Sequence, residues 1–135
     1  MGIRGARRSF GAGRPGLFIW NDGSLLCQYG NSAELAGTGS GCSDGFINTA
    51  PAGSLKPNAL GLFDMHGNVW EWVADCWQPQ YSAKPVKPAE ACTTRVLRGG
   101  SWASAAGALR SAARGWESQD KGKNSIGFRV ARALP

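Results

Sequence analysis

Short runs in which apolar and polar residues alternate recur in the second half of the chain. Residues 69–73 alternate around Glu71, and residues 95–97 resemble a buried strand that ends at a pair of glycines. Residues 126–134 alternate apolar with basic positions. Alternation with a period of two is typical of strands that bury one face. We therefore expect a sheet of short strands, with a further strand at 17–20 near the start of the chain.

Polar segments separate these predicted strands. Residues 30–53, 78–94 and 115–125 have the composition of loops, whereas the alanine-rich stretch 103–114 predicts one or two helical turns around Leu109. Glycine fills 20 of the 135 positions, and each glycine inside a helix costs about 1 kcal/mol relative to alanine. The pattern predicts an α+β fold with little regular secondary structure.

Length and composition limit the class of protein. A chain of 135 residues fits one domain, and 42% hydrophobic residues with six Trp argue against disorder. No apolar run approaches the ~20 residues that cross a bilayer, so we expect no membrane segment. No signal peptide is visible. We divide the chain into a flexible, basic, glycine-rich leader at 1–16 and a domain at 17–135.

The formal net charge of +6 is unevenly distributed. Residues 1–16 carry four Arg and no acid, residues 17–92 carry three Lys against seven acids, and residues 93–135 carry eight bases against two acids. Because the basic residues are scattered along the chain, this charge does not favour a nucleic-acid-binding protein. An acidic middle and a basic end are compatible with ion pairs inside one fold, or with separate sites for cations and anions.

Four cysteines stand at positions 27, 42, 76 and 92, and none has C-x-x-C spacing. The single His66 adds little to a zinc site, and we expect it at the surface or in a cap. The spacings indicate two local disulfides, Cys27–Cys42 and Cys76–Cys92, one of three possible connectivities. The alternative is four reduced, buried thiols. Disulfides point to an extracytoplasmic setting, although the compartment stays open.

Two carboxylates flank the glycine–asparagine turn at 67–68. Asp64 precedes this turn, and Glu71 follows it between two tryptophans, where an unpaired charge would be costly to bury. The partner of Glu71 is then a metal ion or an arginine from the basic C-terminal part. A hard cation such as Ca²⁺ takes about six to eight oxygen ligands. Asn31 and Asp44 offer further oxygens in the long predicted loop, although Asp-Gly is also an ordinary turn signal.

Three strings in this order resemble a known family: GLFDMHGNVWEW at 61–72, RVLRGGSW at 95–102 and IGFRVA at 126–131. They are similar to the signature segments of the formylglycine-generating enzyme (sulfatase-modifying factor) family. The resemblance covers residues 17–135 and corresponds to the C-terminal part of a family domain. It implies the family's irregular variant of the C-type-lectin fold.

The resemblance implies two calcium sites, each built from two side chains and two main-chain carbonyls. The first consists of the side chains of Asp64 and Glu71 and the carbonyls of Gly67 and Val69. The second consists of the side chains of Asn31 and Asp44 and the carbonyls of Ser32 and Phe46. All four side chains offer oxygen donors, so we expect Ca²⁺ as the cofactor.

The family's catalytic site does not carry over. The resembling enzymes place two cysteines shortly after the RGGSW string, and these thiolates bind copper and oxidise a substrate cysteine. Here the run from Ala103 to Leu109 holds no cysteine. Copper(I) selects soft sulfur ligands, which Ser104 cannot replace. Trp70 and Ser101 match family pocket residues, but we expect no copper and no catalytic residues.

The implied function is a non-catalytic, calcium-stabilised, lectin-like binding module. We expect a protein or small ligand to bind through residues 102–125, because Trp and Arg often anchor interfaces. The residues assigned to this surface are Ser101, Trp102, Ser104, Arg110, Arg114, Trp116 and Gln119. The variable proteins of diversity-generating retroelements resemble the chain in this segment. The alternative is an oxidase that converts a sulfatase cysteine to formylglycine, or a related oxidative enzyme.

Overall fold

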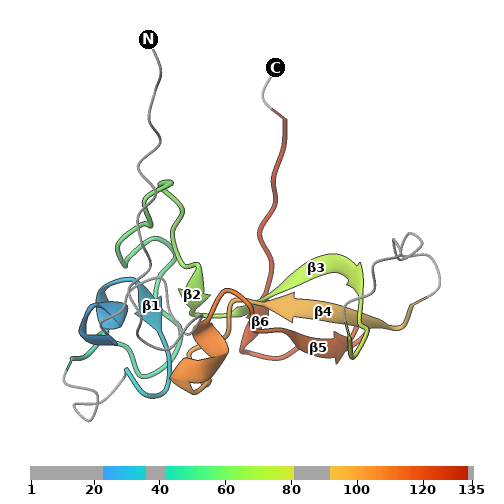
Figure 1. The fold of residues 1–135 in the computed structure, drawn as a ribbon, viewed down its shortest axis with the longest axis horizontal. Coiled ribbons are helices and arrows are strands. Elements are labelled where there is room, and N and C mark those ends of the chain that lie inside the picture. The colour runs from blue at the N-terminus through green and yellow to red at the C-terminus, as the bar shows by residue number, and fades with distance from the viewer. Residues whose placement is uncertain (1–22, 36–41, 81–91, 134–135) are drawn as a thin grey trace.

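The computed structural model describes residues 23–35, 42–80 and 92–133 of the chain. Within them, a four-stranded sheet lies on one side of the molecule, and loops around a two-stranded ladder lie on the other (Figure 1). In this described part, no helix has the length and apolar character to cross a membrane. The predicted leader at 1–16, the predicted strand at 17–20 and residues 81–91 of a predicted loop lie outside the described residues.

The strand order of the larger sheet is β5-β4-β3-β6. Its strands are β3 (Trp70–Cys76), β4 (Thr94–Arg98), β5 (Gly115–Ser118) and β6 (Ile126–Gly127). β4 runs antiparallel to both β3 and β5, whereas β6 runs parallel to β3. The predictions of strands around 69–73 and 95–97 are confirmed.

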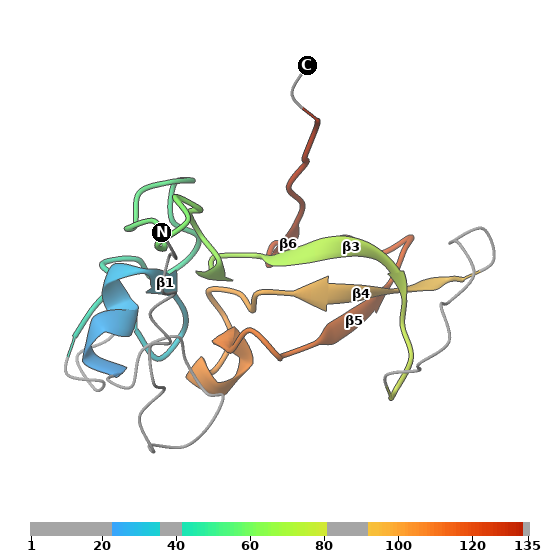
Figure 2. The ribbon, with the colours of Figure 1, turned by 45° about the horizontal axis from the view of Figure 1, so that its top comes forward.

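The smaller ladder joins two short parallel strands that are far apart in the sequence. β1 (Gly30–Asn31) pairs with β2 (His66–Gly67), and Asn31 lies opposite Gly67. Gly67 has φ +86°, and a Cβ there would lie 1.7 Å from the Asn31 carbonyl oxygen, so this close approach requires glycine. The 3-10 helix η1 (Gly23–Gln28) lies beside β1 in both ribbon views (Figures 1 and 2).

A small apolar cluster joins the N-terminal loops to the C-terminal part. Leu26, Cys27, Leu35 and Leu109 pack together, and Leu109 is completely buried. Leu109 ends the 3-10 helix η3 (Ala106–Leu109), which confirms the predicted helical turn in the alanine-rich segment. Val96 and Leu97 of β4 are also buried, and as consecutive residues of a strand they face opposite sides of the larger sheet.

Both predicted disulfides are present. Cys27 is bonded to Cys42 and Cys76 to Cys92, with Cα–Cα distances of 6.1 and 5.8 Å. In the chain-entropy model, closing a loop of this length contributes about 3 kcal/mol. The first disulfide closes the segment that carries Asn31, and the second connects the end of β3 to the approach of β4.

Three predictions are wrong. Residues 115–125 are not a loop throughout, because β5 pairs with β4 and sets Trp116 opposite Val96. The final strand does not span 126–134, because β3 pairs with 126–127 alone and residues 128–133 are exposed beyond the ladder (Figure 1). The surface placement of His66 is wrong, because this side chain is buried. Its Nδ1 lies 2.8 Å from the carbonyl oxygen of Leu109, the last residue of η3, which fits the other expectation of a cap.

Candidate functional site

The first cluster of polar groups surrounds Asn31, at the end of β1. Asn31 and Ser32 are each 1% exposed and Asp44 is 8% exposed. The Asp44 carboxylate accepts hydrogen bonds from the main-chain N–H of Ser32 at 3.2 Å and of Phe46 at 2.8 Å. The structure therefore brings together all four residues that the sequence assigns to the second calcium site.

Two oxygens in this cluster have no hydrogen-bond partner among the described residues. They are Oδ1 of Asn31 and Oγ of Ser32, both buried. The Asn31 amide is oriented by its own Nδ2, which donates to the carbonyl of Asn48 at 3.0 Å. A buried polar oxygen without a donor costs free energy unless a cation or water satisfies it. The donor set, one carboxylate with amide and carbonyl oxygens, suits a hard cation.

The second cluster surrounds Asp64 and Glu71. Asp64 has a left-handed backbone with φ +56°, and its Oδ2 accepts a hydrogen bond from the Gly53 N–H at 2.8 Å. Oδ1 of Asp64 is buried and has no partner within the described residues. Both carboxylate oxygens of Glu71 accept hydrogen bonds from Nε of Arg129, at 2.8 and 2.7 Å.

The sequence predicted either a metal ion or an arginine of the C-terminal part as the partner of Glu71, and the structure shows Arg129 in this place. Besides the ion pair, its guanidinium donates to the carbonyl oxygens of Phe63 at 3.1 Å and Asp64 at 3.2 Å. The hydrogen bond to Glu71 raises the pKa of Arg129. A cation held by Asp64 and Glu71 would therefore share Glu71 with this arginine, and calcium at this site stays a prediction.

Among the described residues, no group of three or more His, Cys, Asp or Glu side chains gathers in a geometry suited to a metal ion. A cation bound in this part of the molecule must therefore draw on amide and main-chain carbonyl oxygens as well as carboxylates. Such mixed oxygen donors are the usual ligands of calcium.

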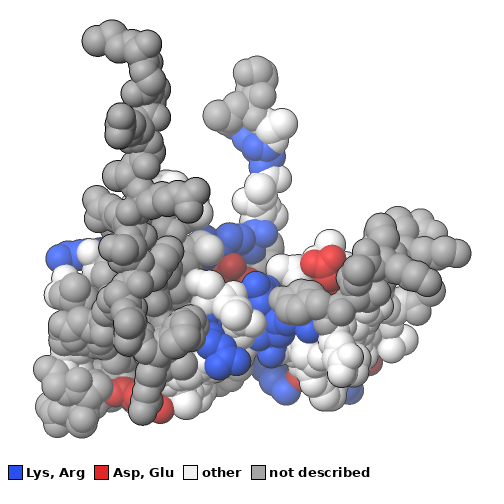
Figure 3. Space-filling model, viewed as in Figure 1, with Lys and Arg blue, Asp and Glu red and all other residues white. Residues whose placement is uncertain are grey.

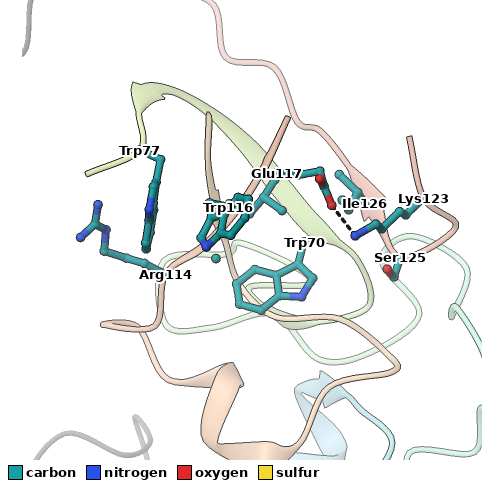
Figure 4. A pocket seen from close by; sticks show the side chains of 10 residues that line it. Trp70, Trp77, Arg114, Trp116, Glu117, Lys123, Ser125 and Ile126 are labelled. Carbon is teal, nitrogen blue, oxygen red and sulfur yellow. Dashed lines mark ion pairs between the residues drawn. The ribbon is translucent and has the colours of Figure 1, made fainter. Parts of the chain in front are cut away.

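A third feature is a hollow of about 410 Å³ on the sheet, lined by tryptophans (Figure 4). Trp70 comes from β3, Trp77 from just after β3, and Trp116 from β5. The ring centroids of Trp77 and Trp116 are 6.3 Å apart, and Trp116 is 57% exposed. Trp70 and Trp77 are half-buried. Tryptophan rings that line a hollow in this way offer large apolar area with a hydrogen-bonding N–H.

Charged side chains border the hollow. The guanidinium of Arg114 lies 4.5 Å above the Trp77 ring and donates to the carbonyl of Gln78, an arrangement that a cation–π interaction favours. Lys123 forms an ion pair with Glu117 (Figure 4). The pKa of Glu117 is lowered, chiefly by the hydrogen bond from Lys123 and next by that from the Ser118 N–H.

The residues assigned to the binding surface fall into separate places. Arg114 and Trp116 share the hollow, whereas the side chains of Arg110 and Gln119 are exposed elsewhere. Ser101, Trp102 and Ser104 form a tight turn in which the Ser104 Oγ accepts from the Ser101 N–H at 3.1 Å. The Trp102 indole N–H donates to Asn124 at 3.4 Å, which places it next to the Ser125 rim of the hollow.

Sequence reasoning missed Trp77, Glu117 and Lys123. Trp77 lies just beyond the predicted alternation, and the ion pair spans a segment that was predicted to be a surface loop. On the face drawn in Figure 3, Lys and Arg side chains gather near the middle of the molecule, where carboxylates are fewer. This face therefore carries a basic region.

The comparison with protein families decides the identity of the domain. The family model described as "Sulfatase-modifying factor enzyme 1-like domain" matches residues 5–134. The chain belongs to this family. Its fold is the irregular α+β, C-type-lectin-like fold that the three sequence strings implied.

Two relatives of this sulfatase-modifying factor domain illustrate the range of the family. The chain is 41% identical over 96 residues to the formylglycine-generating enzyme of Streptomyces coelicolor, covering 65% of this chain and 30% of that enzyme. It is 35% identical over 99 residues to the "Inactive C-alpha-formylglycine-generating enzyme 2" of Mus musculus, covering 69% of this chain and 29% of that protein. The chain therefore spans about a third of the length of these relatives.

Among solved structures, the domain is similar to Treponema denticola variable protein 1. The TM-score is 0.63 and the identity is 28%, and the match covers 81% of this chain and 37% of the other. The family domain thus shares its architecture with a variable protein as well as sharing sequence with formylglycine-generating enzymes.

Proposed function

We propose that this sulfatase-modifying factor domain is a non-catalytic binding module that holds calcium and binds a ligand at the tryptophan-lined hollow. The observation that carries the proposal is the buried Oδ1 of Asn31, which has no hydrogen-bond partner in the described part of the chain. It lies in the cluster held together by the Asp44 carboxylate. A hard cation needs such oxygen donors, and binding one would offset the free-energy cost of leaving this buried oxygen without a partner.

The residues that would hold the ion are the side chains of Asn31 and Asp44 and the main-chain carbonyls of Ser32 and Phe46. Bound calcium supplies positive charge that satisfies buried oxygens. The chain itself preorganises the cluster, because Asp44 already bonds to the main chain on both sides of it. The Cys27–Cys42 disulfide, which encloses Asn31, keeps the two ligand-bearing segments close.

The cysteines support a non-catalytic role. All four form disulfides, and the run that follows Trp102 contains none. The thiol oxidation of the family's enzymes depends on reactive thiolates, which the disulfides do not provide. The similarity to a mouse relative named as inactive is consistent with this role.

The hollow supports the binding role. It combines exposed indole faces with the Arg114 guanidinium and the Lys123–Glu117 ion pair. A ligand with a flat apolar face and polar substituents matches this lining. A narrower form of the proposal is a variable protein of a diversity-generating retroelement. A near-copy of codons 98–130 elsewhere in the genome, with adenines at the variable positions, would support it.

Thermal unfolding with calcium and with a chelator tests the calcium part. A site formed only in the folded state stabilises by mass action, and at 100 times the Kd the melting temperature rises by roughly 10 °C. Asp44→Asn should remove most of the rise, whereas Asp75→Asn, at an exposed position of β3, should keep it. Identical melting curves with calcium and with chelator would refute the calcium site.

The alternative function is a formylglycine-generating oxidase, favoured by the 41% identity to the Streptomyces enzyme. It predicts that the protein with added copper converts the cysteine of a sulfatase peptide to an aldehyde. The proposed binding role predicts no conversion above a peptide-only control.

A further inference from the structure

One residue of the GNVWEW string, Asn68, forms hydrogen bonds to three separate segments of the chain. It is neither one of the proposed calcium ligands nor part of the tryptophan-lined hollow. Asn68 is 8% exposed and has a left-handed backbone with φ +64°. Asparagine is among the few residues that adopt this conformation at modest cost. All four polar groups of Asn68, the main-chain N–H and carbonyl and the side-chain Oδ1 and Nδ2, form hydrogen bonds.

The main chain of Asn68 joins the two proposed sites. Its N–H donates to the carbonyl of Asn31 at 3.0 Å, and its carbonyl accepts from the N–H of Trp102 at 2.9 Å. A chain of two hydrogen bonds thus runs from the proposed calcium ligand to the turn that presents Trp102. Trp102 in turn contacts Asn124, next to the rim of the hollow.

The side chain of Asn68 holds the other wall of the cluster. Oδ1 accepts from the N–H of Ala50 at 3.0 Å, and Nδ2 donates to the carbonyl of Ala50 at 3.1 Å. The same loop is bonded by Asn31, whose Nδ2 donates to Asn48. Asn31 and Asn68 therefore both form side-chain hydrogen bonds to the loop at 48–50, which lies four to six residues beyond Asp44.

A second set of main-chain hydrogen bonds joins the segment after Asn31 to the turn at 101–104. The N–H of Ala33 donates to the carbonyl of Ser104 at 3.2 Å, and the N–H of Ser104 donates to the carbonyl of Ser101 at 3.0 Å. The turn at 101–104 is thus attached to residues 31–33 at two points, through Asn68 at Trp102 and directly at Ser104. Both attachments start within two residues of Asn31.

We propose that Asn68 is the positioning residue that couples the cation site at Asn31 and Asp44 to the turn at 101–104. The inference rests on the calcium site of the proposed function. A cation on the Asn31 amide fixes the main chain of Asn31 and the loop at 48–50. Asn68 is bonded to both, and it transmits this ordering to Trp102 through its main-chain carbonyl. Calcium then orders the binding surface without touching the ligand.

Amide hydrogen exchange of the whole chain, with calcium and with a chelator, tests this coupling. The Ser32 amide, which bonds to Asp44, reports on the site itself, and the Trp102 amide reports on the turn. In the wild type, calcium should slow exchange at both, with an effect at Trp102 of roughly tenfold, the size expected from one net hydrogen bond. Asn68→Gly keeps the left-handed backbone and both main-chain hydrogen bonds but removes the side-chain hydrogen bonds to Ala50. In this variant, calcium should still protect Ser32, whereas its effect at Trp102 should fall severalfold.

Controls separate coupling from general weakening. Asn58→Gly removes an asparagine that bonds to the N–H groups of Leu60 and Leu62 in an exposed loop, and it should leave the calcium effect at Trp102 unchanged. A purely structural role for Asn68 would lower Trp102 protection equally with and without calcium. If Asn68→Gly does not fold, Asn68→Asp keeps the acceptor for Ala50 and should lose part of the effect.

The outcomes distinguish this inference from the function it rests on. Calcium protection of Ser32 without any change at Trp102 in the wild type would overturn the coupling and leave the calcium site standing. Retention of the full Trp102 effect in Asn68→Gly would also overturn it. No calcium effect at either amide would overturn both the coupling and the calcium site.

Discussion

At the scale of single residues, the sequence predicted the burial of side chains that stand out from their local neighbours. It did not predict burial that depends on a partner far away in the sequence. Leu109 stood out as the one large apolar residue in an alanine-rich stretch, and it is completely buried. His66 was misplaced because its partner, the Leu109 carbonyl, lies 43 positions away. The unpartnered oxygen of Asn31 was likewise invisible, since burial of an asparagine depends on tertiary packing.

Leu109→Ala should cost about 3 kcal/mol of unfolding free energy, because it removes a fully buried side chain and leaves a cavity. Leu60→Ala is the matched control, since Leu60 is 82% exposed, and it should change stability by less than about 0.5 kcal/mol. Urea unfolding measures both. Equal losses of unfolding free energy in the two variants would contradict the assignment of Leu109 to the core.

Lys123→Met should raise the pKa of Glu117 towards its ordinary value, since Lys123 is the largest cause of the lowered pKa. A carboxylate with a lowered folded pKa stabilises the fold above its unfolded pKa, and this contribution is lost as pH falls through the folded pKa. The stability difference between wild type and variant should therefore shrink in acid. Titration of the Glu117 carboxyl by NMR measures the shift, and Lys121→Met should move it less.

At the scale of elements, alternation around Glu71 located β3, and the short apolar run ended by two glycines located β4, because both signals lie within the strand's own sequence. It missed β5, since the four residues GWES are too short for a periodic signal and gain their partner only when Trp116 meets Val96. It overextended the last strand, because alternation in 128–133 persists where β3 no longer pairs with it. Arg129 instead fixes this segment through its side chain and Glu71.

Substitutions at the exposed edge of β5 and in the adjacent segments should affect ligand binding more than folding. Trp116→Ala and Arg114→Ala should each cost about 1 kcal/mol or less, because the first is 57% exposed and the second borders an open hollow. Trp70→Ala should cost about 3 kcal/mol, since the Trp70 ring is packed where a Cβ on Gly115 would lie 3.4 Å away. Thermal unfolding ranks the three variants. Unfolding by Trp116→Ala as severe as by Trp70→Ala would make this segment core and remove the binding surface.

At the scale of the whole molecule, three strings of sequence were enough to predict the family and its irregular fold, both of which are confirmed. The tryptophan-lined hollow was not predictable in the same way. Its walls come from β3, β5 and the residues before β6, and no local pattern states that these segments meet.

The most direct test of the account is a calorimetric titration of the chelator-treated protein with calcium. The account predicts binding by the wild type and by Glu71→Gln at the Asn31 site, and loss of that binding in Asp44→Asn. Binding by Glu71→Gln with reduced stoichiometry would place a second ion at Asp64 and Glu71. Absence of binding by the folded wild type, or binding by Asp44→Asn as tight as by wild type, would contradict the account.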